Sequence, residues 1–184
     1  MYKPIITLLS IAILSTTIAC NKSSSTTTPS TSSGGNGGGG GGGGTTTSTS
    51  FSVKINGTTY TGTPKSCIKQ SVSGLVSANM LAEIPYKGGT WTFNVVLSQY
   101  TTPKTYYTSG NDTMANLSMT NMANTSEGFS AFSPFAPQED GVCTVTKDDK
   151  TYIEGNFSGT LYKGSTTITD SVKVTDGKFV FKWN

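Results

Sequence analysis

The 184-residue sequence contains no histidine and no arginine, and charged residues make up 12% of it. Without histidine, serine–histidine–aspartate catalysis, cysteine–histidine catalysis and histidine metal sites are excluded. Without arginine there is no bidentate clamp for phosphate or carboxylate groups. The lysines form no basic cluster and the formal net charge is +3, so a nucleic-acid partner is not expected. The sequence predicts neither a metal nor a cofactor.

Long apolar runs are equally scarce, and the one that is present lies at the N-terminus. The chain opens MYKPIITLLSIAILSTTIAC, with Lys3 before the apolar run and small or hydroxylated residues after it. This is the three-part layout of a secretory signal peptide. The run of about ten residues is half of the roughly twenty that a membrane-spanning helix needs. We therefore predict a signal peptide over residues 1–19.

The end of this segment, TIAC, resembles the lipobox of bacterial lipoproteins, and Thr17 fits the looser lipoboxes of the Bacteroidota. The resemblance implies that Cys20 receives a diacylglyceryl group, becomes the first residue after cleavage and is then acylated. It also implies an outer-membrane partner, reached through the lipid. The alternative is an ordinary signal peptide with a chance cysteine beside its cleavage site.

The chain has three cysteines, and an odd number in an exported protein needs an explanation. If Cys20 carries lipid, Cys67 and Cys143 remain as the single pair that can form a disulfide. Export permits such a bond. Closing its loop of about 75 residues would stabilise the fold by about 4 kcal/mol in the chain-entropy model. Two buried free thiols are the alternative.

Residues 20–50 comprise the lipidated cysteine and a Ser/Thr/Gly-rich linker without apolar side chains. We predict that the linker is disordered, because it has nothing to bury. As a flexible coil it spans roughly 30 Å. Surface-displayed lipoproteins of the Bacteroidota often carry acidic residues after the cysteine, and CNKSSS has none. This favours the periplasmic face of the outer membrane over the cell surface.

From Phe51 onward, aromatic and β-branched residues alternate with glycine and asparagine turn signals. We predict one all-β domain over residues 51–184, an antiparallel β-sandwich or barrel-like sheet of roughly 8–10 strands. Hairpins are expected at Asn56–Gly57 and at Asp176–Gly177. Across Asp176–Gly177 the apolar residues change from even to odd positions, as a two-residue hairpin requires, and a bulge is the alternative.

Other segments support the β prediction. TWTFNVVLSQY and YIEGNFSGTLY alternate as strands do, and the glycines of the second leave room for large neighbours. No segment predicts an amphipathic helix. ANLSMTNMANTSEG is rich in Ser, Thr and Asn, which allows at most a helical turn.

Three segments, FSVKINGTTYTG, YYTSGNDTMANLSM and IEGNFSGTLYKGSTTITDSVKVTDGKFVFKW, resemble a family of small Bacteroidota lipoprotein domains of unknown function. The resemblance covers most of residues 51–184 and rests on turn and core signatures. It implies the fold and an envelope location. It implies no catalytic residues, because the family has no established activity.

Carbohydrate is the main ligand candidate, because tyrosine and tryptophan offer apolar ring faces with polar edges. The candidate contact residues are Trp91, Tyr100, Tyr106 and Tyr107. Core packing is the alternative, and the adjacent Tyr106 and Tyr107 must face opposite sides of a strand. Two carboxylates would suffice for a glycosidase. KDDK, residues 147–150, indicates a hairpin loop and lacks the alternating ligand spacing of calcium loops.

Two short segments, DTM and DSV, resemble the acceptor of O-glycosylation in the Bacteroidota, which implies modification of Thr113 and Ser171. The chain is thus expected to be an outer-membrane lipoprotein with a non-enzymatic binding or envelope-structural module. The alternatives are a carbohydrate-binding accessory of a glycan-uptake system and, third, a carboxylate-dependent hydrolase. The expected partner besides the membrane is a glycan or an envelope protein.

Overall fold

The computed structural model describes residues 48–101, 103–109, 114–132, 140–164 and 167–184. The predicted signal peptide, Cys20 and nearly all of the linker lie outside these residues. The described part contains ten strands and no helix. The strands are β1 (Ser50–Ile55), β2 (Thr58–Val72), β3 (Leu75–Tyr86), β4 (Gly89–Ser98), β5 (Thr105–Tyr107), β6 (Met114–Asn121), β7 (Gly128–Ser130), β8 (Val142–Asp148), β9 (Tyr152–Lys163) and β10 (Asp170–Lys182).

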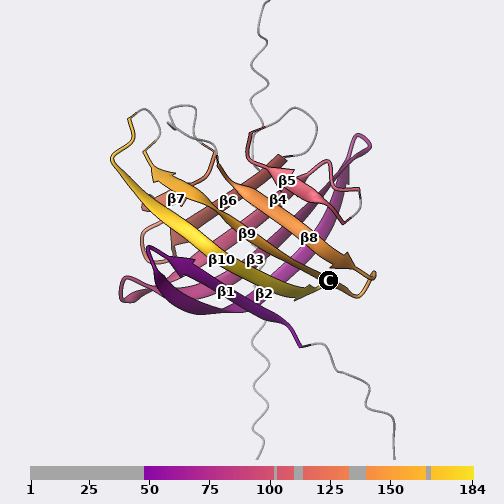
Figure 1. Cartoon of the computed structure of the whole chain (residues 1–184), viewed down its shortest axis with the longest axis horizontal. Coiled ribbons are helices and arrows are strands. Elements are labelled where there is room, and N and C mark those ends of the chain that lie inside the picture. The colour runs from indigo at the N-terminus through magenta and orange to yellow at the C-terminus, as the bar shows by residue number, and fades with distance from the viewer. Residues whose placement is uncertain (1–47, 102, 110–113, 133–139, 165–166) are drawn as a thin grey trace, which may run out of the picture. The chain divides into compact units, whose positions relative to one another are not determined.

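The strands form one sheet that closes on itself (Figure 1). The order is β10-β1-β2-β3-β4-β6-β5-β8-β9-β7, and further pairings of β10 with β9 and of β6 with β7 complete the ring. Neighbouring strands are antiparallel except β5 and β6, which are parallel. The predicted all-β fold is confirmed, in its barrel-like form. Closure removes the edge strands that an open sheet would expose.

The barrel has two ends, which we name after a residue at each. The turns from β1 to β2 and from β3 to β4 lie at the Asn56 end, on the left in Figure 1. The turns from β2 to β3 and from β8 to β9 lie at the Asp148 end, together with the C-terminus. Two short strands complete the wall between the long strands, since β5 joins β6 to β8 and β7 joins β6 to β9.

Phenylalanine rings fill the interior of the barrel. Phe51 lies 5.4 Å from Phe93, 5.5 Å from Phe157 and 6.3 Å from Phe181, measured between ring centroids. Phe179 lies 6.3 Å from Phe157. All five side chains are at most 2% exposed. They come from β1, β4, β9 and β10, so burial of these rings joins opposite walls of the sheet.

Two glycines make room for these rings. A Cβ on Gly155 would lie 2.6 Å from Cζ of Phe179, and one on Gly177 would lie 2.5 Å from Cε2 of Phe157. Both distances are far below ordinary contact, so a side chain at either position would displace a core ring. The space predicted beside the β9 glycines is therefore confirmed for Gly155.

The predicted hairpin at Asn56–Gly57 is confirmed. Ile55 pairs with Thr58, and the turn residues Asn56 and Gly57 have φ angles of 47° and 85°. Positive φ at both central positions is the type I′ geometry that Asn-Gly favours.

The predicted hairpin at Asp176–Gly177 is wrong, because β10 runs through these residues as one strand. Val174 pairs with Gly159 of β9 and Gly177 pairs with Phe157, with a register shift between the two pairs. The extra residue forms a bulge, in which Asp176 has a φ of 51°. The bulge moves the inward-facing set from even to odd positions without reversing the chain.

The first half of ANLSMTNMANTSEG forms no helical turn, since β6 occupies Met114–Asn121. The second half contains a single turn, in which the N–H of Glu127 donates to the carbonyl of Asn124 at 2.9 Å. Ala115, Leu117 and Met119 face inward and are at most 1% exposed. Pairing with β4 on one side and with β5 and β7 on the other outweighs the weak local preference.

Candidate functional site

Three of the four predicted ligand-contact aromatics lie in the core. Trp91, Tyr100 and Tyr106 are 1%, 2% and 0% exposed, whereas Tyr107 is 53% exposed. The prediction is wrong for the first three because the closed sheet encloses their rings near its two ends. Tyr107 faces outward, opposite to Tyr106, as their adjacency predicted. A single exposed tyrosine does not form an aromatic platform for a sugar.

Cys67 and Cys143 are free and buried, so the predicted disulfide is wrong. They lie on β2 and β8, which are not neighbours in the sheet. Burial raises the pKa of both thiols to about 12, and the charge of Asp148 adds to this effect at Cys67. Both thiols are therefore protonated at neutral pH and pack as small apolar groups.

The predicted modification sites fall partly outside the described residues. Ser171 lies at the start of β10 and is exposed. Cys20 and Thr113 are not among the described residues. Lipidation at Cys20 and O-glycosylation at Thr113 and Ser171 remain predictions.

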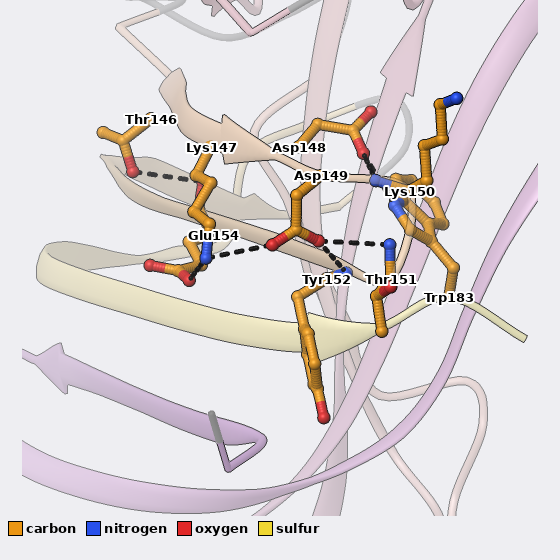
Figure 2. A network of polar contacts seen from close by, with 9 residues as sticks. All are labelled: Thr146, Lys147, Asp148, Asp149, Lys150, Thr151, Tyr152, Glu154 and Trp183. Atoms are coloured by element: carbon orange, nitrogen blue, oxygen red, sulfur yellow. Dashed lines mark hydrogen bonds and ion pairs between the residues drawn. The ribbon is translucent and has the colours of Figure 1, made fainter. Parts of the chain in front are cut away.

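A half-buried carboxylate holds the Asp148 end together. Asp148 accepts hydrogen bonds from Oη of Tyr100 at 2.7 Å, Nε1 of Trp183 at 2.9 Å and Nζ of Lys69 at 3.0 Å. It also accepts one from the backbone N–H of Lys150 at 3.3 Å, and Figure 2 shows Trp183 beside it. The Asp148 side chain is 11% exposed. In this Asp148 network, one carboxylate joins its own turn to three segments that are distant in the sequence.

At neutral pH the hydrogen bond between Tyr100 and Asp148 joins a neutral phenol to an ionised carboxylate. Burial alone would raise the pKa of Asp148, but the hydrogen bonds from Tyr100, Trp183 and Lys69 outweigh it and hold the pKa below its ordinary value. Burial, followed by the hydrogen bond to Asp148, raises the pKa of Tyr100. Both shifts favour the protonation states that keep the hydrogen bond.

The lysine of this network also covers the aromatic rings. Nζ of Lys69 lies 4.9 Å from the ring centroid of Tyr100 and 4.5 Å from that of Trp183. Tyr100 stacks on Tyr106 at 5.8 Å between centroids and 16° between planes. The cation, the carboxylate and the rings therefore close the Asp148 end as one unit.

The remaining carboxylates near this end build the β8–β9 turn (Figure 2). Asp149 accepts hydrogen bonds from the backbone N–H groups of Tyr152 at 2.8 Å and Thr151 at 3.1 Å. Nζ of Lys147 lies 3.1 Å from Oδ2 of Asp149 and 3.0 Å from Oε1 of Glu154. The hairpin loop predicted from KDDK is confirmed.

A glycosidase needs two carboxyl groups close together. Asp149 and Glu154 are two carboxylates that lie near each other, because both contact Nζ of Lys147. Their side chains are 41% and 30% exposed. Hydrogen bonds from Tyr152 and Lys147 lower the pKa of Asp149, whereas a general acid needs a raised pKa. Within the described residues, no group of three or more Cys, Asp or Glu side chains is placed to hold a metal ion.

An aromatic cluster closes the Asn56 end. Tyr86 meets Tyr60 at 5.4 Å and Trp91 at 5.3 Å between centroids, both edge-on, and Trp91 lies 6.1 Å from Phe129. Nζ of Lys87 lies 5.5 Å from the Tyr86 centroid and 5.6 Å from that of Phe129. This end therefore has rings and a cation, but they do not surround a carboxylate as at the other end.

The outer face of β6, β7 and β9 is hollowed near the Asn56 end by a groove of about 450 Å³. We call it the hydroxyl groove, because most of its lining side chains carry a hydroxyl group. It is lined by Ser118, Thr120, Thr125, Ser126, Gly128, Phe129, Ser130, Tyr162, Lys163, Gly164 and Thr169. No local motif predicted the groove, since its residues come from strands and loops that meet only in the folded sheet.

None of the described residues belongs to a helix that is long and apolar enough to cross a membrane. Comparison with family models, curated proteins and solved structures found no match to this chain. The functional proposal therefore depends on the sequence signals and on the geometry of the groove.

Proposed function

We propose that the chain is a lipoprotein of the bacterial outer membrane whose β domain is a non-enzymatic binding module. The observation that carries this proposal is the hydroxyl groove, which exposes polar side chains on an outer wall of the barrel. The predicted signal peptide and TIAC support the anchor at Cys20, and CNKSSS supports the periplasmic face. The resemblance to small Bacteroidota lipoproteins supports the same location.

The interior packing supports binding at the surface. Phenylalanine rings occupy the middle of the barrel and aromatic clusters close both ends. A ligand would therefore bind on the outer wall, where strands β6, β7 and β9 supply much of the groove lining. A linker as flexible as its composition predicts would let this wall turn toward a partner within roughly 30 Å of the anchor.

A second candidate function is that of a carbohydrate-binding accessory in a glycan-uptake system. The lining of the groove favours it, because hydroxyl groups are matched donors and acceptors for sugar hydroxyls. The first proposal also includes an envelope-structural role, in which the groove binds another envelope protein and not a glycan.

The anchor is tested by labelling cells with radioactive palmitate. We expect label in the wild-type protein and none in Cys20→Ala. Cys143→Ala is the matched control, because it removes a cysteine of the β domain and should keep the label. Equal labelling of wild type and Cys20→Ala would refute the lipid anchor.

The binding function is tested by a pull-down, in which immobilised residues 21–184 capture components of the solubilised cell envelope. Ser118→Trp fills the hydroxyl groove, while Thr61→Trp adds the same side chain at an exposed position on β2. We expect a component that is captured by wild type and by Thr61→Trp but lost with Ser118→Trp. Thermal unfolding must first show that both variants are folded. Equal capture by all three proteins would exclude the groove as the binding site.

A further inference from the structure

We propose that the hydroxyl groove binds a neutral saccharide, with Tyr162 as its central contact residue. This inference rests on the proposed binding function, and it adds the ligand class and the contact residues. Three observations on the outer wall carry it: the spacing of the hydroxyl groups, the state of Tyr162 and the charge of the lining.

The hydroxyl groups on β6 and β7 are regularly spaced across the groove. Ser118 of β6 pairs with Ser130 of β7, and Thr120 lies two residues further along β6, opposite Gly128. Ser118, Thr120 and Ser130 face outward, since Leu117, Met119 and Phe129 between them are buried. Pleated-sheet geometry places such groups about 5 Å apart across strands and about 7 Å apart along a strand. This is the scale on which a pyranose ring presents its hydroxyls.

Tyr162 has a hydrogen-bonding group without a partner. It faces outward, because its neighbour Leu161 points into the core, yet only 6% of its surface is exposed. The register places it between Ser130 of β7 and Ser171 of β10. Its hydroxyl makes no hydrogen bond with the other described residues. The ring is covered, but the hydroxyl is not one of the buried side-chain atoms without a partner, so it reaches the groove and is open to a ligand hydroxyl.

The same cross-strand row continues to β4, where Asn94 pairs with Ser118, but Asn94 does not line the groove. Within the row, Oγ of Ser130 is already engaged, because it donates to Oδ1 of Asn116 at 3.2 Å and accepts from the backbone N–H of Phe132 at 3.2 Å. The hydroxyl groups of the row that stay open to a ligand are therefore those of Ser118 and Tyr162. A polyhydroxylated ligand, with the water that it orders, suits such a row.

The lining of the groove carries little net charge. Lys163 is the charged residue in the lining, and its Nζ lies 3.7 Å from Oε1 of Glu127. The wall of β10, β1 and β2 carries more lysines, namely Lys54, Lys65, Lys173, Lys178 and Lys182, although Lys54 pairs with Asp176 and Lys65 with Glu83. A polyanion would be drawn to the lysines and not to the groove. The groove therefore suits a neutral ligand.

The test begins with residues 21–184 on an array of neutral oligosaccharides, namely glucans, mannans, xylans, galactans and chito-oligosaccharides, with heparin and polygalacturonate as anionic probes. Isothermal titration then measures the affinity for the strongest neutral probe. We expect Tyr162→Phe to weaken binding about tenfold, since the ring stays and one hydrogen bond is lost. We expect Thr120→Val, an isosteric loss of a hydroxyl, to weaken it about threefold.

The matched controls are Tyr107→Phe and Thr61→Val, which make the same changes outside the groove and should bind like wild type. The inference is overturned if no neutral probe binds, if only the anionic probes bind, or if Tyr162→Phe and Tyr107→Phe bind equally. Capture of an envelope protein through the groove, with no neutral saccharide bound, would uphold the proposed binding function and reject the saccharide.

Discussion

Both ends of the barrel are closed by aromatic rings beneath a lysine, but different interactions hold them. At the Asn56 end, Lys87 lies over the rings of Tyr86 and Phe129, and no ion pair of Lys87 occurs among the described residues. At the Asp148 end, Lys69 bonds directly to Asp148 at 3.0 Å. The first end is an apolar cluster covered by a cation, and the second is a cluster organised by a half-buried carboxylate.

The difference shows two physical ways of closing one fold. Ring packing at the Asn56 end depends on contact area and changes little with pH. The Asp148 network depends on a charge that must be present, and its partners are left unpaired if the charge is lost. Variants at the two ends should therefore differ in the size of the stability loss, in its pH dependence and in how accessible nearby thiols become.

The largest effect is expected from Trp91→Ala at the Asn56 end. Trp91 is 1% exposed and contacts Tyr86 and Phe129. We expect the free energy of unfolding to fall by about 3–5 kcal/mol, the usual cost of deleting a buried tryptophan. Urea unfolding of residues 21–184 at pH 7 measures it. A loss below about 1 kcal/mol would show that this end does not depend on ring packing.

Asp148→Ala is expected to cost somewhat less, about 2–4 kcal/mol, because it leaves the part-buried donors of Tyr100 and Trp183 unpaired. The same urea titration measures this loss. Asp149→Ala is the matched control, since that carboxylate is exposed in the β8–β9 turn and should matter much less. Equal losses for the two variants would contradict the organising role of Asp148.

The pH dependence separates the ends further. Because the folded pKa of Asp148 is lowered, its contribution to stability is present above the ordinary value of 3.8 and is lost as the pH falls through the lower, folded pKa. Urea midpoints between pH 7 and pH 2.5 should therefore fall less steeply in Asp148→Asn than in wild type. Trp91→Phe should keep the wild-type slope. An unchanged slope in Asp148→Asn would contradict the ionic account of this end.

The two lysines should differ by a smaller amount. Lys69→Met removes an ion pair and two ring contacts and should cost about 1 kcal/mol. Lys87→Met removes ring contacts alone and should cost about 0.5 kcal/mol. Urea unfolding at low and high salt measures both losses. Salt should reduce the effect of Lys69→Met more, and equal salt dependence would contradict the comparison.

The smallest effect concerns the thiols. A reductant should leave stability unchanged, and thiol titration of denatured residues 21–184 should find two free thiols, because Cys67 and Cys143 are not bridged. In the native protein both should react slowly, since burial raises each pKa to about 12. In Asp148→Ala, mass spectrometry should find faster labelling of Cys67 and unchanged labelling of Cys143. Faster labelling of both would mean global loosening instead.

Local chemistry predicted a large part of the fold. The Asn56–Gly57 turn, the alternation in β4 and β9 and the space beside Gly155 all follow from residues that are close in sequence. The turn formed by KDDK was predicted for the same reason. The carboxylate that organises the Asp148 end lies within that motif, but its partners come from distant segments, so the sequence offered no signal for them.

The failures have a common cause. The change of parity at Asp176–Gly177 suited a hairpin or a bulge equally, and the pairing of β10 with both β9 and β1 decided for the bulge. Trp91 and Tyr106 read equally well as ligand contacts or as core. Cys67 and Cys143 were paired by counting, and counting says nothing about the strands on which they lie.

The sequence by itself determined an all-β chain with period-two alternation, a type I′ turn and a set of reactive groups without histidine or arginine. The tertiary structure alone decided that the sheet closes, that rings seal its two ends and that hydroxyl groups from β6, β7 and β9 share a groove. The physical reason is that alternation assigns each residue to one of two faces, while the register between distant strands decides which faces are enclosed and which side chains meet.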